Sequence, residues 1–212
     1  MISDIQKLRV QIRDHTGQQS GRIAVELNTS CPNIKHAPPP SYNMPSLVPL
    51  LAVLAEAFWE DATLTIGLKL PPYLYATQFE DALAAVAALT RGERNPVAFF
   101  TCTNTLGNSL LFANQLEGHL DASAANPAFA LPTPLGGLAG EPLHALALGN
   151  VYTFARLLAA HPSACMRGIS IIGVGGVADA AGARRMKTAG ANVVGCATLL
   201  GRQGVDGFAA LA

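Results

Sequence analysis

The stretch 169–201 constrains the fold most, because two apolar runs of strand length flank a helical segment. Ile169–Val174 is apolar and rich in β-branched residues, and two glycines follow it directly. Asp179–Ala189 has helix-forming composition, with an acidic start and basic residues near its end, as the helix dipole favours. Asn192–Cys196 is the second apolar run. This order predicts a strand–turn–helix–strand unit with parallel strands.

The turns after these two predicted strands carry few side chains. Gly175-Gly176 follows the first strand, and Ala197-Thr198 follows the second. Such turns present backbone N–H groups to an anion, and in a (β/α) barrel the loops after the last two strands commonly bind phosphate. The alternative is tight strand–helix packing without a ligand, since glycine turns are frequent in α/β proteins.

Composition narrows the class of protein. Half of the 212 residues are hydrophobic, which suits one domain over 1–212. Only 13% of the residues are charged and the net charge is zero. The sequence has no basic stripe of the kind that indicates nucleic-acid binding. Apolar runs are too short for a membrane span. The four cysteines are scattered without a C-x-x-C pair, which favours reduced thiols in the cytoplasm and no metal framework.

The alternation of strands and helices continues along the chain. Strands are predicted near 23–27, 63–69, 97–103, 169–174 and 192–196. Helices are predicted over Ile2–Asp14, Ser46–Trp59, Thr77–Leu89 with Thr77 as N-cap, His144–Ala160, Asp179–Ala189 and the start of a last helix at 204–212. Residues 34–45 are expected to form a loop, and 106–143 an insertion with short antiparallel strands. The alternation implies a parallel sheet with outer helices, either open or part of a closed barrel.

Polar residues follow the first predicted strand. Cys31 lies between two carboxamides, Asn28 and Asn33, at the opening of the proline-rich loop. The thiol is interpreted as a nucleophile, a base or a packed core cysteine, and reactivity would need help from its surroundings. The asparagines suit a polar site better than an apolar core, because each offers donors and acceptors.

Two other strand ends carry polar side chains. Lys69 lies between leucines in an apolar strand, where a lysine is rarely buried without a partner. Its charge is expected to face a carboxylate, a phosphate or an electron-rich cofactor, unless the side chain reaches solvent along the surface. Asn104 and Thr105 follow the next strand and suit a flat polar ligand, although for these two residues alone an ordinary asparagine turn is the better explanation.

Six motifs, in this order and at this rough spacing, resemble dihydroorotate dehydrogenase. They are Glu26–Asn33 (ELNTSCPN), Lys69–Pro72 (KLPP), Thr103–Asn108 (TNTLGN), Gly136–Gly140 (GGLAG), Ile172–Val177 (IGVGGV) and Ala197-Thr198. Cysteine in the Ser-Cys-Pro-Asn loop is similar to the soluble class 1 enzymes, whereas the membrane-associated class 2 enzymes carry serine there. The resemblance implies a TIM (β/α)₈ barrel with FMN across its C-terminal mouth. It also implies oxidation of (S)-dihydroorotate to orotate in de novo pyrimidine (UMP) biosynthesis, with fumarate as electron acceptor and a homodimer as the assembly.

The resemblance also implies residue roles. Cys31 would match the base that removes a proton from substrate C5, while a hydride leaves C6 for the flavin, and Lys69 the catalytic lysine near the flavin ring. The matches to substrate-binding residues are Asn28, Asn33, Asn104 and Thr105. The matches to FMN-binding residues are Asn28, Lys69, Thr103, Gly140, Gly175, Gly176, Ala197 and Thr198.

The chain departs from the family in two main ways. Ala139 and Ala197 stand where glycines are usual, so either methyl group could crowd the cofactor. The chain also begins at the helix before the family's fourth strand, which predicts an incomplete barrel of five βα units with two open edges and weak FMN binding. Two other functions stay open: a domain like that of dihydropyrimidine dehydrogenase, and a non-catalytic flavin- or phosphate-binding module.

Overall fold

The computed structural model describes residues 1–14, 23–31, 39–115, 129–130 and 132–211, and a five-stranded parallel sheet forms their centre. In spatial order its strands are β1 (Ala24–Asn28), β2 (Thr65–Leu70), β3 (Val97–Cys102), β6 (Ser170–Val174) and β7 (Val193–Gly195). Each strand runs parallel to its neighbour. The five predicted strands are therefore confirmed, with bounds that differ by one or two residues.

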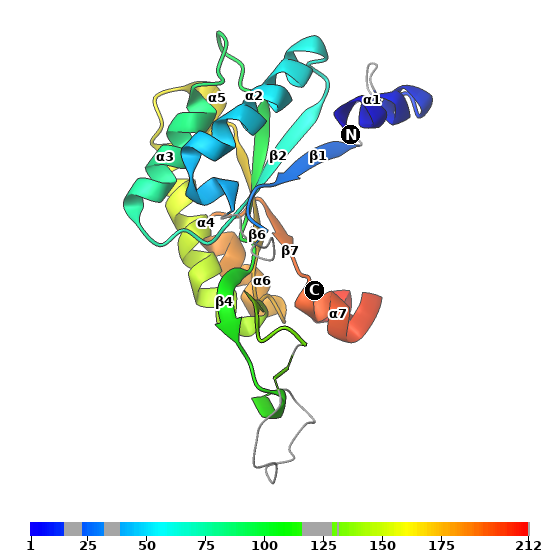
Figure 1. The fold of residues 1–212 in the computed structure, drawn as a ribbon, viewed down its shortest axis with the longest axis vertical. Coiled ribbons are helices and arrows are strands. Elements are labelled where there is room, and N and C mark those ends of the chain that lie inside the picture. The colour runs from blue at the N-terminus through cyan, green and yellow to red at the C-terminus, as the bar shows by residue number, and fades with distance from the viewer. Residues whose placement is uncertain (15–22, 32–38, 116–128, 131, 212) are drawn as a thin grey trace.

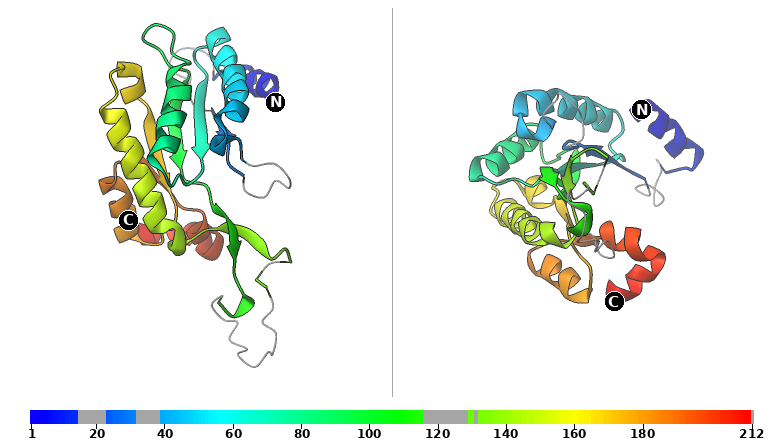
Figure 2. Two further views of the ribbon diagram at one scale, coloured as in Figure 1. Left: turned by 60° about the vertical axis from the view of Figure 1, so that its left-hand side comes forward. Right: turned by 60° about the horizontal axis from the view of Figure 1, so that its bottom comes forward.

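The helices form an arc around the sheet (Figures 1 and 2). They are α1 (Ile2–Gln11), α2 (Met44–Glu60), α3 (Ala76–Ala87), α4 (His144–Ala159), α5 (Ala164–Arg167), α6 (Ala180–Thr188) and α7 (Thr198–Gln203). Short 3₁₀ helices cover Pro40–Tyr42, Ala113–Gln115, Glu141–Leu143 and Gly204–Leu211. Helices α2, α3, α4 and α6 lie along one side of the sheet, whereas α1 and α7 lie at the two separated ends of the arc (Figure 1).

The hydrophobic core lies between the sheet and these helices. Side chains alternate across a strand, and every second residue of β2, Ile66, Leu68 and Leu70, is at most 1% exposed. Aromatic rings fill the space behind the sheet. The Phe154 ring of α4 lies 5.0 Å from that of Phe79 and 5.3 Å from that of Phe100. Full burial of such side chains stabilises the fold by about 1.5–3 kcal/mol each.

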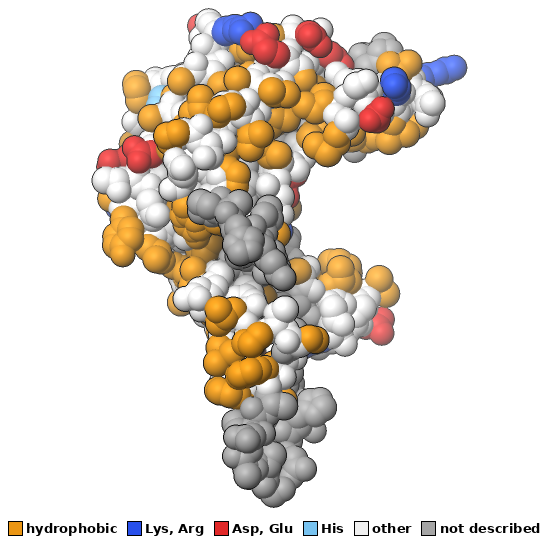
Figure 3. Space-filling model, viewed as in Figure 1, with side chains coloured by type: hydrophobic (Ala, Val, Ile, Leu, Met, Phe, Trp, Pro, Cys, Tyr) orange, Lys and Arg blue, Asp and Glu red, His pale blue; other side chains and the backbone are white. Residues whose placement is uncertain are grey.

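The other face of the sheet is less covered. Glu26 of β1 is exposed and accepts a hydrogen bond from Thr101 of β3. The Phe99 ring lies over Gly67, where an added Cβ would come within 2.1 Å of it. Within the described residues, β1 and β7 each lack a partner strand on their outer side, and the surface is hollowed between α1 and α7 (Figure 3). The expected incomplete barrel, with five βα units and two open edges, is thus confirmed.

A hairpin follows β3 at its carboxyl end. Its strands β4 (Leu106–Leu110) and β5 (Leu135–Leu138) pair antiparallel and extend away from the sheet (Figure 1). The prediction of short antiparallel strands in 106–143 is confirmed for the residues described there.

Several predicted helix ends are wrong, and α1 ends at Gln11 rather than at Asp14. Helix α3 begins at Ala76, so Thr77 is not its N-cap. The Gln78 side-chain oxygen instead accepts the N–H groups of Leu74 at 2.8 Å and Tyr75 at 3.1 Å. Helix α2 begins at Met44, two residues earlier than predicted, and the last helical segment begins at α7 and continues as the 3₁₀ helix after it. Side-chain hydrogen bonds set the start of α3 and an early proline that of α2, rather than the apolar pattern.

Helix α1 differs most from its predicted packing. Its side chains Leu8 and Val10 are 46% and 57% exposed, whereas Arg9 is fully buried. The Arg9 guanidinium bonds Asp14 at 3.3 Å and Asp61 at 2.8 Å, which ties α1 to the loop between α2 and β2. A charged network therefore attaches this helix, while part of its apolar surface stays uncovered.

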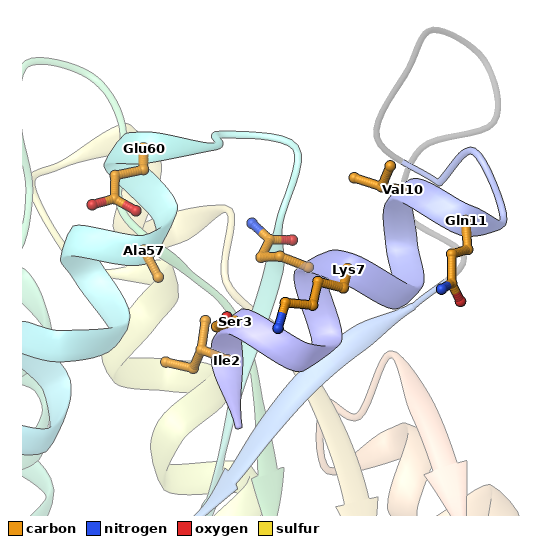
Figure 4. A pocket seen from close by; sticks show the side chains of 8 residues that line it. Ile2, Ser3, Lys7, Val10, Gln11, Ala57 and Glu60 are labelled. Atoms are coloured by element: carbon orange, nitrogen blue, oxygen red, sulfur yellow. The ribbon is translucent and has the colours of Figure 1, made fainter.

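A shallow pocket separates α1 from the last turn of α2 (Figure 4). Its lining consists of Ile2, Ser3, Gln6, Lys7, Val10, Gln11, Ala57 and Glu60. None of these residues was predicted to carry chemistry. No helix in the described part of the chain is both long and apolar enough to cross a membrane.

Candidate functional site

The predicted site residues gather at the carboxyl edge of the sheet. In a parallel sheet all strands end at the same edge, so residues distant in sequence meet there. A cavity at this edge is lined by Lys69, Thr103, Asn104, Thr105, Ala139, Gly140, Leu143, Val174, Gly175, Gly176, Val177, Ala197 and Thr198. Nine of the predicted residues are in this group. Asn28 and Cys31 lie at the same edge of the sheet, and Asn33 lies outside the described residues.

Three turns without bulky side chains converge on the cavity. Gly140, Gly175 and Gly176 have φ of +72°, +143° and +65°, conformations that favour glycine. A Cβ on Gly176 would lie 2.6 Å from the Gly140 carbonyl oxygen, and one on Gly140 would lie 3.5 Å from the Thr198 methyl group. Gly176 therefore has no room for a side chain, whereas a methyl group on Gly140 would make only ordinary contact with Thr198.

The turn after β6 has unused hydrogen-bond donors. Among the described residues, no acceptor is bonded by the backbone N–H groups of Gly175, Gly176 or Val177. All three residues line the cavity. Unused N–H groups at a glycine turn are what an anion such as phosphate requires.

Ala139 and Ala197, which stand where the family usually has glycine, do not have the positive φ that would favour glycine. Ala197 has φ of −110°, and Ala139 is not among the described residues with positive φ. Neither position therefore requires glycine for its conformation.

A hydrogen-bonded amide cluster joins the ends of β1 and β3. The Asn104 side-chain nitrogen donates to the Asn28 side-chain oxygen at 3.0 Å and to the Ser30 hydroxyl at 3.1 Å. The Asn104 side-chain oxygen accepts the Thr105 N–H at 2.9 Å. Both hydrogens of the Asn104 amide are thus used to hold the loop after β1, which fixes the orientation of Asn28.

Two hydroxyl residues that the sequence analysis missed secure the same loop. Thr29 and Ser30 are 1% and 2% exposed, and their hydroxyls donate to the Lys69 carbonyl at 2.7 Å and 3.2 Å. Their position directly after a strand, before a cysteine, was the available signal. They hold the backbone of Cys31 close to the end of β2.

Lys69 contributes a cation to the cavity. Its side chain is half-buried, and it forms no ion pair with any carboxylate of the described residues. Next to it, Thr103 is 3% exposed, and its hydroxyl is buried without a hydrogen-bond partner in the described part of the chain. A buried, unsatisfied hydroxyl costs about 1–3 kcal/mol, so this group favours a ligand that bonds it.

The cysteines differ in their surroundings. Cys31 is partly buried at the end of β1, and the register pairs Asn28 with Lys69, so Cys31 and Lys69 share one edge of the sheet. Cys102 is fully buried in the core, and this burial raises the pKa of its thiol. Cys102 is a packed core cysteine, whereas Cys31 is partly exposed. No group of three or more metal-ligating side chains occurs in the ranges that the structure covers.

The fold and site define an open α/β barrel segment whose carboxyl edge carries glycine turns and polar side chains. The sequence profile of the family described as dihydroorotate dehydrogenase matches residues 14–211. The chain belongs to this family.

Curated relatives agree with this assignment, and a solved structure agrees with the fold. The chain is 31% identical over 187 residues to a probable dihydroorotate dehydrogenase A (fumarate) of Streptococcus pneumoniae serotype 4, covering 88% of this chain and 51% of the relative. It is 29% identical over 184 residues to a putative dihydroorotate dehydrogenase A (fumarate) of Streptococcus agalactiae, covering 87% and 51%. The crystal structure of DHODH from Eimeria tenella in complex with ferulenol matches 99% of this chain and 52% of that chain, with a TM-score of 0.63 at 16% identity. The chain thus spans about half the length of the curated relatives it matches.

Proposed function

We propose that this chain is the carboxyl-terminal part of an FMN-dependent dihydroorotate dehydrogenase, which oxidises (S)-dihydroorotate to orotate in pyrimidine biosynthesis. The observation that carries the proposal is the one cavity shared by Lys69, the unsatisfied Thr103 hydroxyl and the glycine turns. Family membership supports the substrate. The names of the streptococcal relatives support fumarate as the electron acceptor.

The cavity residues fit a flavin phosphate and one edge of its ring. The free N–H groups at Gly175 and Gly176, with Gly140, Ala197 and Thr198 beside them, would hold the phosphate. Lys69 and Thr103 would lie near the ring, where an ammonium group stabilises negative charge. When bound, FMN would accept the hydride that leaves substrate C6.

The proton step is assigned to Cys31. Its sulfur, as thiolate, would take the proton from C5, and the electrons of that C–H bond would form the C5–C6 double bond as the hydride leaves C6. Asn28, Asn33, Asn104 and Thr105 would hold the pyrimidine ring and its carboxylate. The bonds from Asn104 to Asn28 and Ser30 support this role, because they preorganise the loop that carries the base.

The open sheet supports a further part of the proposal. A five-stranded segment leaves two edges and one face uncovered, so we propose that this chain alone binds FMN weakly and that three further βα units complete the active enzyme. The alternative is a non-catalytic flavin- or phosphate-binding module, which the self-contained glycine turns would also allow.

The test is flavin reduction with and without the amino-terminal half of the Streptococcus pneumoniae relative. With both halves present, we expect a yellow flavin that dihydroorotate bleaches under anaerobic conditions and fumarate restores. Without the added half, we expect weak FMN binding and no bleaching. Stable FMN binding in both samples without bleaching would favour the non-catalytic module, and bleaching by the chain alone would contradict the incomplete-barrel proposal.

The cysteine variants test the base directly. In the two-half sample, Cys31→Ser should keep the flavin but slow its reduction by roughly 10²-fold or more, the scale of general base catalysis. The matched control is Cys165→Ser, because Cys165 is also partly buried but bonds Ser163 at 3.0 Å and lies in α5, before β6 begins and not at the carboxyl edge of the sheet. Unchanged reduction in Cys31→Ser would refute the assignment of Cys31 as base.

A further inference from the structure

A histidine–arginine pair contacts the glycine turn from outside the cavity. His144 is the first residue of α4, and its Nδ1 lies 2.7 Å from the Gly175 carbonyl oxygen. The Arg185 Nε of α6 donates to the His144 Nε2 at 3.1 Å. The pair therefore links two helices to the turn that follows β6.

These contacts determine which imidazole nitrogen carries the proton. An arginine N–H can only donate, so the His144 Nε2 must accept. In the neutral ring the proton then sits on Nδ1, which donates to the Gly175 carbonyl. Arg185 thus holds His144 in the tautomer that binds the turn.

The bond to the carbonyl also orients the N–H of the same peptide. In a planar trans peptide the C=O and the N–H of the next residue point in opposite directions. Fixing the Gly175 carbonyl toward His144 therefore turns the Gly176 N–H away from it. Without that bond, a Gly-Gly peptide has several accessible orientations, because neither residue has a side chain to restrict it.

Packing at the turn supports the same role. A Cβ on Gly176 would lie 2.8 Å from the His144 Cβ, so the first residue of α4 is in direct contact with the turn. Both glycines line the cavity, and their N–H groups bond no atom in the described ranges. The turn is thus held by His144 on one side and open to a ligand on the other.

We propose that His144 and Arg185 are positioning residues that hold the Gly175–Gly176 peptide in the orientation that binds the FMN phosphate. This inference rests on the proposed function, because it takes the ligand at the turn to be that phosphate. Neither residue lines the cavity, so the pair acts through the turn and not on the reacting atoms.

The test measures the affinity of the 212-residue chain for FMN and for riboflavin, which lacks the phosphate. Binding is monitored by flavin fluorescence. His144→Ala should weaken FMN binding roughly fivefold to tenfold, as expected for one lost hydrogen bond, and leave riboflavin binding unchanged. His144→Asn should restore most of the affinity, because its side-chain nitrogen can reach the same carbonyl. Arg185→Leu should give a smaller loss, and Arg184→Leu, an exposed neighbour of equal charge, should give none.

A second readout is independent of flavin. Nitrogen NMR of the unliganded chain at mildly alkaline pH should show His144 protonated on Nδ1, and Arg185→Leu should release this preference. Because Arg185 is exposed, this variant is expected to fold even where His144→Ala does not.

The outcomes separate the two claims. Failure of the wild-type chain to prefer FMN over riboflavin contradicts the proposed function and this inference with it. A clear FMN preference that His144→Ala and Arg185→Leu leave unchanged contradicts this inference alone. Equal weakening of both flavins, or a His144 protonated on Nε2, also overturns it.

Discussion

Substitution of Gly176 by alanine tests the glycine cradle most sharply. The new Cβ would lie 2.6 Å from the Gly140 carbonyl oxygen, 2.8 Å from the His144 Cβ and 3.0 Å from the Glu141 Cα. Two of these three atoms belong to the backbone, so no flexible side chain can move aside. The residue also has φ of +65°, where a non-glycine residue costs about 1–2 kcal/mol.

The two costs combine into a measurable change. Overpacking of a tight contact costs about 1–3 kcal/mol, so together with the backbone strain we expect Gly176→Ala to lower the free energy of unfolding by about 2–5 kcal/mol. Where the turn instead shifts to relieve the clash, part of this loss appears as weaker FMN binding. Urea unfolding of the 212-residue chain measures the change in stability. A separate titration, monitored by flavin fluorescence, measures the change in FMN binding.

The matched control is Gly149→Ala in α4. Gly149 is exposed, has no heavy atom within 4 Å of its built Cβ and sits inside a helix. Alanine there should stabilise the chain by roughly 0.5–1 kcal/mol. If Gly176→Ala behaved like this control in both stability and FMN binding, the convergence of the turns would be refuted.

Three further predictions concern the rest of the molecule. Arg9→Met should lower the free energy of unfolding by about 3–5 kcal/mol, because it removes a fully buried guanidinium that bonds both Asp14 and Asp61. Lys7→Met, which removes an exposed pair with Asp4, should leave the free energy of unfolding nearly unchanged. Burial favours protonation of Asp61, but hydrogen bonds from Thr63 and Gln6 and the charge of Arg9 outweigh it and lower the pKa. The stability that Asp61 contributes is therefore complete above the ordinary carboxyl pKa and is lost as the pH falls through the lower pKa of the folded state. Asp61→Asn should make the free energy of unfolding, measured by urea titration at acidic pH, depend less on pH. Asn104→Ala should leave FMN binding intact but slow dihydroorotate oxidation by the two-half sample, and an unchanged rate would show that its bonds to the loop after β1 are dispensable.

The sheet could be predicted from the sequence because its strands are marked locally. Runs such as Ile66–Leu70 and Ile169–Val174 are apolar, of strand length and bounded by turn residues. Their parallel order follows from the helices between them. The gathering of Lys69, Asn104 and Thr198 at one edge follows from that order in turn.

The parts that were wrong or missed depend on contacts between distant residues. The apolar pattern of Ile2–Asp14 indicates an amphipathic helix, but Arg9 is buried and Val10 is exposed because the bonds to Asp61 determine how α1 packs. The cap of α3 is likewise set by Gln78 and not by Thr77. The pattern of neighbouring residues in the sequence predicts neither arrangement.

The site was predicted as a set of residues, but not as a network. The links from Asn104 to Ser30 and from His144 to Gly175 join positions 74 and 31 residues apart. The position of Ser30 after a strand indicates a polar site but not the partner of its hydroxyl, and His144 has no local signature, because its role comes from a turn after another strand. The sequence therefore indicated which polar residues meet at the carboxyl edge but not which hydrogen bonds join them.

The most direct test of the central claim is a crystal structure of this chain grown with FMN. The account predicts phosphate oxygens within hydrogen-bond distance of the Gly175–Gly176 turn and Thr198, and the flavin ring between the sulfur of Cys31 and the ammonium of Lys69. A flavin whose phosphate lies elsewhere on the molecule, or whose ring contacts neither side chain, would contradict it.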